Sequence, residues 1–186
     1  GYSSHLIKLA LIEVRKVAYN QTSGLYQNNK AFYSLLRYGA QGLKDENKDR
    51  VTVDLIDWKN IDNNDFAVAQ EVSVLCFDNK RHKRPDVVIY VNGIALGVFE
   101  LKRSSVSIGE GIRQNLTNQK DENIARFFNT VQFTFAGNEA EGLKYGTICT
   151  AEKYYLQWKE DQNAKDALSI KIKELQGKES NRLRDG

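Results

Sequence analysis

The sequence predicts a mixed α/β domain in which helices flank a central β-sheet. Apolar residues recur at helical spacing near the N-terminus, whereas from about residue 51 they alternate with polar residues, as in half-buried strands. Further along, two apolar runs of strand length are joined by Asn92-Gly93, which is a strong signal for a β-hairpin. Strands and helices therefore occur along one chain, and we expect a mixed sheet packed between helices.

The composition is that of a globular protein with room for one domain and a short tail. The chain has 186 residues, of which 41% are hydrophobic and 27% charged, and its formal net charge is +3. These values permit nucleic-acid binding without requiring it. No apolar run reaches the ~20 residues of a membrane-spanning helix, and no secretory signal pattern is recognisable. We therefore expect no membrane partner and a cytoplasmic location.

The chain has few residues suited to disulfide or zinc chemistry. Cys76 and Cys149 lie far apart in apolar, strand-like surroundings, which predicts two buried thiols in a reducing compartment. His5 and His82 are isolated, and none of these four residues has the spacing of a zinc site.

Two helices are expected before the first strand. The first has an imperfect apolar stripe, which consists of Leu6, Leu9, Ala10 and Val17. We expect the second helix to begin at a cap formed by Asn28 or Asn29 and to end at Gly39. Its inner face is formed by Phe32, Leu35 and Leu36.

The middle of the chain is expected to form strands. Alternation predicts a strand over residues 51–57, and a turn cluster at 60–64 separates it from a long strand over 66–77. The two hairpin strands cover 87–91 and 94–101. Both are too apolar for an edge position, which places them near the centre of the sheet.

The C-terminal third begins with a third helix. Ser107 and Glu110 have capping-box spacing, and Ile112 and Leu116 would share the inner face of the helix that follows. Two more strands are expected, over residues 131–136 and 145–150. After Trp158 the chain is rich in charged residues but keeps a helical apolar spacing. We therefore expect a domain over 1–160 and a charged helical tail or linker over 161–186.

The residues best suited to chemistry lie at the two ends of the hairpin. Asp86 precedes its first strand, and Glu100-Leu101-Lys102 closes its second. Residues two apart in a strand share a face, so Glu100 and Lys102 project together. A carboxylate and an ammonium at the end of an apolar strand are costly to bury unless they are paired or bind an ion. The spacing alone leaves open the alternative of an ordinary Lys–Glu surface pair.

The hairpin register decides whether Asp86 joins these residues. A two-residue turn at Asn92-Gly93, followed by regular pairing, sets Asp86 on the face opposite to Glu100. A three-residue loop with Gly93 as a left-handed bulge pairs Tyr90 with Ile94 and brings Asp86 to the face of Glu100. We expect this register, or another bulge with the same effect.

Two converging carboxylates suit a hard cation such as Mg²⁺, which takes oxygen ligands and keeps several waters. Such an ion polarises a phosphate oxygen and lowers the pKa of a bound water. Lys102 would orient that water or stabilise charge that develops on the phosphate oxygens. This division of roles fits metal-dependent hydrolysis of phosphodiester bonds.

At these residues the chain resembles the PD-(D/E)xK nuclease superfamily. Further segments occur in the following order: NNKAFYSLLRYG, VDLIDW, NNDFAVAQEVSV, RPDVVIYVNGIALGVFELK and YGTICTAEKYYLQWK. Together they resemble the N-terminal nuclease domain of the R (restriction) subunit of type I restriction-modification enzymes, over about residues 25–160.

This resemblance implies a restriction-endonuclease-like central sheet and an Mg²⁺-dependent cleavage site formed by Asp86, Glu100 and Lys102. The two carboxylates would be the metal ligands. A downstream Gln-x-x-x-Tyr motif of the family is matched at Gln114, which becomes a further candidate catalytic residue. Asn118 stands where the family has the tyrosine, which puts the role of that position in doubt.

Basic residues next to Asp86 are candidates for contacts with the phosphates of double-stranded DNA. These residues are Lys80, Arg81, Lys83, Arg84 and, after the hairpin, Arg103, where the family usually has a polar residue such as asparagine. A solvated basic loop is the alternative interpretation. Glu71 either joins the site as an extra acid or lies on a solvated face.

The resemblance also implies partners. The R subunit is an ATP-driven DNA translocase that acts with methyltransferase and specificity subunits, and the specificity subunit reads the DNA sequence. This chain has no Gly-x-x-x-x-Gly-Lys-Ser/Thr loop, so we expect ATP only in a motor part of the parent subunit. Two alternatives stay open: a repair or recombination nuclease of the same superfamily, and a non-catalytic DNA-binding or subunit-docking module.

Overall fold

The computed structural model describes residues 2–47, 49–161, 166, 169–170 and 173. The chain divides into two compact units, Gly1–Leu156 and Gln157–Gly186. Most of the expected charged tail over 161–186 lies outside the described residues, and those of its residues from 166 onward that are described are helical. The expected boundary between residues 160 and 161 stays a prediction.

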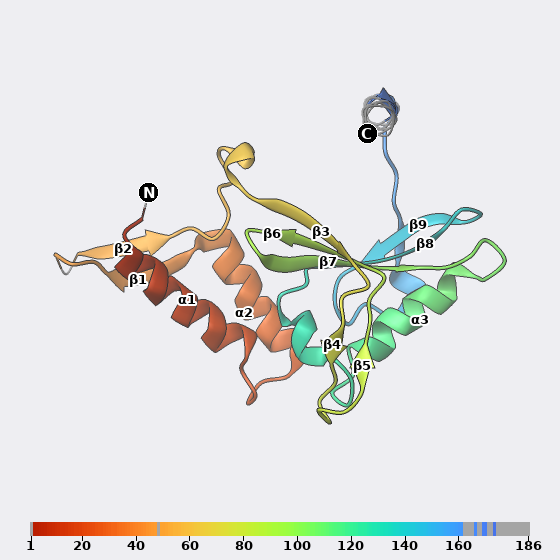
Figure 1. The fold of residues 1–186 in the computed structure, drawn as a ribbon, viewed down its shortest axis with the longest axis horizontal. Coiled ribbons are helices and arrows are strands. Elements are labelled where there is room, and N and C mark those ends of the chain that lie inside the picture. Colours follow the sequence, from red (N-terminus) through yellow and green to blue (C-terminus); the bar gives the residue numbers. More distant parts are fainter. Residues whose placement is uncertain (1, 48, 162–165, 167–168, 171–172, 174–186) are drawn as a thin grey trace, which may run out of the picture. The chain divides into compact units, whose positions relative to one another are not determined.

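A mixed six-stranded sheet has the strand order β10-β9-β8-β7-β6-β3. Figure 1 labels the strands from β9 to β3 of this sheet. Its strands are β3 (Phe66–Gln70), β6 (Val87–Val91), β7 (Ile94–Leu101), β8 (Phe133–Asn138), β9 (Gly142–Gly146) and β10 (Leu156–Gln157). β7 and β8 run parallel, whereas β3–β6, β6–β7 and β8–β9 are antiparallel pairs. The predicted α/β class with a mixed central sheet is therefore confirmed, and the hairpin strands β6 and β7 lie in the interior of the sheet.

Among the described residues up to 161 there are three α-helices, which are α1 (Ser4–Ala18), α2 (Leu25–Tyr38) and α3 (Ile108–Asn118). α1 and α2 pack against each other, and α3 packs against β7 and β8 (Figure 1). Parallel strands need a crossover connection, and α3 with the 3₁₀ segment Ala125–Asn129 supplies it between β7 and β8. Ile108 and Ile112 of α3 join Ala136 of β8 in one buried cluster. No helix of the described residues is both long and apolar enough to cross a bilayer.

The predicted cap of the second helix is wrong. α2 begins at Leu25, so Asn28 and Asn29 lie inside the helix and are buried. Their side-chain amides donate to backbone carbonyls elsewhere: Asn28 to Asn20 and Ser23, and Asn29 to Val131 at 2.6 Å. The two asparagine side chains, which the sequence pattern assigned to helix capping, thus bond to backbone carbonyls outside the helix. The predicted end at Gly39 is confirmed, with a φ of 71°.

The strand expected over residues 51–57 is only partly correct. It forms β2 (Arg50–Val53), which pairs with β1 (Ala40–Lys44), a strand that the sequence pattern did not indicate. Asp57 instead accepts the backbone N–H groups of Lys59 and Asn60, which fixes a turn. Local side chain–backbone bonds of this kind compete with strand pairing.

The long strand expected over residues 66–77 is interrupted. β3 ends at Gln70, and Glu71 has a φ of 51°, in the left-handed region that no strand can continue through. The next short strand, β4 (Val74–Leu75), pairs with β5 (His82–Lys83) in a separate hairpin. This hairpin carries the basic run of the sequence.

The two strands expected near the C-terminus are shifted relative to the prediction. β8 (Phe133–Asn138) begins two residues later than expected and β9 (Gly142–Gly146) three residues earlier. The chain has therefore left the sheet when it reaches Cys149, which is exposed, has a φ of 60° and does not face the core. The expectation of two buried thiols is wrong for Cys149 and confirmed for Cys76.

Candidate active site

The register of the β6–β7 hairpin differs in form from the expectation but has the expected effect. Asn92-Gly93 is a two-residue turn with positive φ at both positions, and it pairs Val91 with Ile94, so the expected three-residue loop is wrong. The pairing shifts between Tyr90 and Ile89, where β7 has one extra residue. A bulge of this kind moves the following residues to the other face.

Beyond the bulge the pairing is regular and brings the two acids together. Val87 pairs with Phe99, so the preceding Asp86 lies across from Glu100. The Asp86 carboxylate accepts the backbone N–H of Leu101 at 2.7 Å, which holds it against the end of β7. The bulge is thus the feature that places Asp86 on the face of Glu100.

Glu100 is the most unusual residue of the site, because its carboxyl group is fully buried. Oε1 accepts a hydrogen bond from the Asn118 side chain at 3.1 Å, while Oε2 accepts no hydrogen bond among the described residues. Burial and, next, the negative charge of Asp86 raise the pKa of Glu100 to about 8, although Lys102 acts in the opposite direction. A hydrogen bond between the Glu100 and Asp86 side chains favours the protonated form of Glu100. The buried position therefore favours the protonated acid unless a cation offsets the two negative charges.

Lys102 and Gln114 also meet at this site. The Lys102 ammonium donates to the Gln114 side-chain oxygen at 2.5 Å, which joins the end of β7 to α3. Both side chains line an open groove of about 780 Å³, together with Lys83 and Asn118. The groove continues along the N-terminal half of α3, past Ser107 and Arg113 to Ser105.

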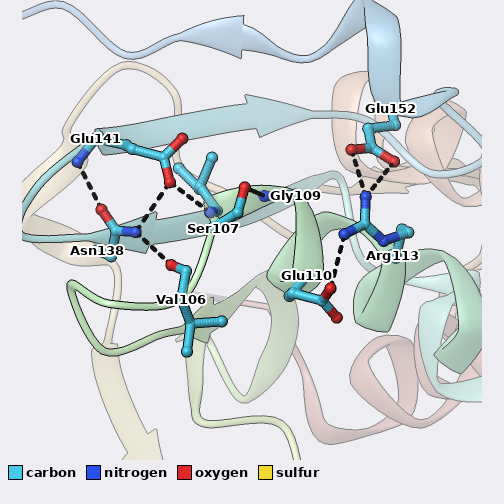
Figure 2. Close-up of polar contacts among 9 residues, drawn as sticks. Val106, Ser107, Gly109, Glu110, Arg113, Asn138, Glu141 and Glu152 are labelled. Carbon is cyan, nitrogen blue, oxygen red and sulfur yellow. Dashed lines mark hydrogen bonds and ion pairs between the residues drawn. The ribbon is translucent and has the colours of Figure 1, made fainter.

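Polar contacts at its N-terminal end anchor α3 (Figure 2). The Glu141 carboxylate accepts the backbone N–H of Ile108 at 2.7 Å, which lowers the pKa of Glu141, and it also accepts from Asn138. Arg113 lies between two acids and donates to Glu152 at 2.8 Å and to Glu110 at 2.9 Å. These contacts hold the helix that carries Gln114 and Asn118.

A glycine lets α3 approach the strand that carries Glu100. A Cβ atom at Gly111 would lie 3.1 Å from the Glu100 carbonyl oxygen and 3.1 Å from the Ala136 Cβ. Both neighbours belong to the central sheet and cannot easily move away. The close approach brings the C-terminal half of α3 within reach of the Glu100 carboxylate.

The donor set fits a hard divalent cation. No group of three or more histidine, cysteine or acidic side chains converges within the part of the chain that the structure describes. Asp86 and Glu100 form a pair, and Glu100 Oε2 is buried without a partner. Mg²⁺ is commonly held by one or two carboxylates and keeps its other ligands as water. Two acids with one free oxygen are therefore sufficient protein ligands for it.

The structure separates the basic residues into distinct environments. Lys83 lines the groove beside Lys102. Arg81 is bound to Asp78 at 2.6 Å and donates to the Glu122 carbonyl. The exposed Arg84 is paired with Glu71 at 3.5 Å, and both side chains are exposed, which favours the solvated position for Glu71. Lys80 and Arg103 are exposed.

Asn118 is the residue whose role the sequence did not indicate. It is 2% exposed and bonds directly to Glu100, although the sequence pattern marked it only as a departure from a tyrosine. Its position one turn after Gln114 could have indicated a shared role, because residues four apart lie on the same face of a helix. The partner of that face was visible only in the structure.

Two carboxylates, a lysine and a supporting helix thus meet at the end of β7. The comparisons with known proteins give the family. The family described as type I restriction enzyme R protein N terminus (HSDR_N) matches residues 4–153, and the chain belongs to this family.

Its relatives are endonuclease subunits of type I restriction enzymes. One, from Methanocaldococcus jannaschii and provisionally named the MjaIXP endonuclease subunit, is 28% identical over 170 residues, which is 89% of this chain and 16% of the relative. The HindI endonuclease subunit of Haemophilus influenzae is 33% identical over 121 residues, or 62% of this chain and 11% of the relative. The SsaAORF53P endonuclease subunit of Staphylococcus saprophyticus is 28% identical over 126 residues, or 65% and 13%. The chain thus spans only a small part of these proteins, and the predicted family is confirmed.

Proposed function

We propose that this domain is the Mg²⁺-dependent endonuclease of a type I restriction enzyme R subunit, with a PD-(D/E)xK fold, and that it hydrolyses DNA phosphodiester bonds without reading their sequence. The observation that carries the proposal is the Glu100 carboxylate. It is fully buried beside Asp86, has an unpartnered oxygen and lies two residues from Lys102. A buried acid without a counter-ion is costly, and a bound cation would offset that cost.

Each residue has a role that follows from its contacts. Asp86 and Glu100 would hold Mg²⁺, which when bound polarises a phosphate oxygen and lowers the pKa of an attacking water. Lys102, kept in place by Gln114, presents a positive charge and a donor to the phosphate oxygens where charge develops. Lys83 lies in the same groove and would contact a neighbouring phosphate. None of these contacts depends on base identity.

The proposed partners are double-stranded DNA and the methyltransferase and specificity subunits of the restriction complex. ATP would bind only in the motor part of the parent subunit. The relatives support this assignment through their description as type I restriction endonuclease subunits, of which the chain matches 11–16%.

The decisive experiment uses the complete restriction complex on DNA that carries its recognition site, with ATP and Mg²⁺. We expect Asp86→Ala and Lys102→Ala to lose DNA cleavage while ATP hydrolysis is retained, because the motor is a separate part. Asp62→Ala and Lys8→Ala, which change exposed residues of the same types, serve as controls. Undiminished cleavage by both site variants would reject the nuclease assignment and favour a non-catalytic docking module.

The salt dependence of DNA binding tests the role of the basic residues. Each phosphate contact that is lost reduces the slope of log K against log salt by roughly 0.9 for duplex DNA. We expect Lys83→Ala to reduce the slope by about this amount. Arg81→Ala should change it less, because Asp78 already neutralises that guanidinium. Equal slopes for wild type and Lys83→Ala would remove Lys83 from the interface.

A further inference from the structure

We propose that Asn118 is a positioning residue of the cleavage site, which holds Glu100 by one carboxylate oxygen so that the other stays free for the metal ion. The proposal rests on the nuclease function proposed above. It assigns a role to the position at which this chain departs from the tyrosine of the resembled motif.

The contact itself is specific to one oxygen. The Asn118 Nδ2 atom donates to Glu100 Oε1 at 3.1 Å, both side chains are buried, and Oε2 accepts no hydrogen bond among the described residues. A neutral amide donor fixes the orientation of a carboxylate without adding a positive charge. A lysine or arginine in its place would neutralise the carboxylate and repel a divalent cation. An amide therefore suits a residue that supports a metal ligand.

The spacing of helix and strand explains why one helix can hold two residues of the site. Gln114 and Asn118 are four residues apart, a rise of about 6 Å in a helix. Lys102 and Glu100 are two residues apart, about 6.7 Å along a strand. Gln114 bonds to Lys102, and Asn118 bonds to Glu100. The later residue of the strand thus contacts the earlier residue of α3, so the two segments run in opposite directions at this site. The two side-chain pairs have closely matched spacing.

Contacts other than the one to the Glu100 carboxylate also hold Asn118 and its helix in place. Its carbonyl accepts the backbone N–H of Ile124 at 3.1 Å. One turn earlier, the buried Asn115 donates to the Phe135 carbonyl at 2.8 Å, which ties the helix to β8. Gly111 lets the helix approach the sheet. The Asn118 side chain is thus presented to Glu100 by a framework that it does not itself hold together.

The test measures metal binding directly, with Mn²⁺ as the probe and the complete R subunit without ATP. The difference in bound Mn²⁺ between wild type and Asp86→Ala measures the Mn²⁺ held at the proposed site. Asn118→Leu keeps the volume of the side chain and removes the donor. Mutation of a residue that hydrogen-bonds to a metal ligand typically lowers the metal affinity by about 10- to 100-fold. We expect a loss of this size in Asn118→Leu. Cleavage by the complete complex should then need more Mg²⁺ and recover at high Mg²⁺.

Asn115→Leu is the matched control, because it makes the same change at a buried asparagine of the same helix that bonds to a backbone carbonyl and not to Glu100. It should lower the melting temperature and leave the Mn²⁺ affinity unchanged. Gln114→Leu should lower the maximal cleavage rate at every Mg²⁺ concentration and leave the Mn²⁺ affinity nearly unchanged. If Asn118→Leu prevents folding, Asn118→Ala replaces it.

The outcomes separate the two proposals. Wild-type Mn²⁺ affinity in a folded Asn118 variant overturns the positioning role, whatever its melting temperature. An equal loss of affinity in Asn115→Leu and Asn118→Leu also overturns it, because the effect would then follow from general loosening of the helix. If Asp86→Ala and Glu100→Gln bind Mn²⁺ like wild type and the complex still cleaves DNA, the nuclease site itself is refuted.

Discussion

Replacement of Glu100 by glutamine is expected to abolish DNA cleavage and, at the same time, to stabilise the metal-free domain. If Glu100 is a metal ligand as proposed, its loss should reduce cleavage at least about a thousandfold, which corresponds to about 4 kcal/mol of transition-state stabilisation. The gain in stability has a separate cause. The pKa of Glu100 is raised from an ordinary value of 4.5 to about 8 by burial and by the charge of Asp86, so ionisation opposes folding.

The sign of the pH dependence follows from the direction of this shift. An acid whose pKa is higher in the folded state binds its proton more tightly there than in the unfolded chain. Its favourable contribution is present below pH 4.5 and is lost progressively as the pH rises from 4.5 to about 8. Glutamine stays neutral over this range, accepts from Asn118 and donates through its own amide. We expect Glu100→Gln to raise the free energy of unfolding by roughly 2–4 kcal/mol at pH 8 and by almost nothing at pH 4.5.

Denaturant unfolding of both proteins at pH 4.5, 7 and 8 without divalent metal measures this effect. Glu46→Gln, at an exposed position, is the control for loss of a negative charge. Addition of Mg²⁺ should stabilise the wild type and leave Glu100→Gln unchanged. A variant less stable than wild type at pH 8 would show that the ionised carboxylate has a partner that offsets its burial.

Replacement of Gly111 by alanine is expected to weaken both the fold and the site. Alanine normally stabilises the interior of a helix by up to about 1 kcal/mol relative to glycine. At Gly111, however, the added Cβ would lie 3.1 Å from the Glu100 carbonyl oxygen and from the Ala136 Cβ. Overpacking of this kind usually destabilises by about 1–3 kcal/mol, so we expect a net loss. Displacement of α3 would also draw Gln114 and Asn118 away from their partners, which lowers cleavage.

Gly109→Ala provides the matched control on the same helix. The atoms nearest to a Cβ at Gly109 are the exposed ends of the Glu152 and Arg113 side chains, the closest at 2.7 Å, and these flexible ends can move while the backbone of α3 stays in place (Figure 2). Thermal unfolding should therefore show a lower midpoint for Gly111→Ala and a nearly unchanged one for Gly109→Ala. A stability gain in Gly111→Ala would mean that the helix can shift outward at little cost, and the close approach would not be required.

Patterns that depend on neighbours in the sequence were predicted well. The hairpin around Asn92-Gly93 follows from turn chemistry, and α1 and α3 follow from helical spacing and capping residues. Glu100 and Lys102 both contact α3, as the two-residue period of a strand predicts. These signals are local, so one sequence suffices to read them.

Features that depend on partners distant in the sequence were missed or wrong. The second helix was predicted to start at Asn28 or Asn29, yet these amides bond to carbonyls as far away as Val131. The break at Glu71 follows from a backbone turn that no residue type signals there. The three-residue hairpin loop was wrong because the extra residue lies within β7 and not at Gly93.

The sequence by itself determined the family and the mixed α/β class, and it supplied Asp86, Glu100 and Lys102 as candidate site residues. Only the tertiary structure decided that Asp86 lies across from Glu100, because a bulge in the middle of β7 changes the face of every residue that follows. It also decided that Asn118 is the partner of Glu100 and that the carboxylate is fully buried. Burial and hydrogen bonds between elements depend on how helix and sheet pack, and that packing sets the pKa of Glu100 and leaves one of its oxygens free.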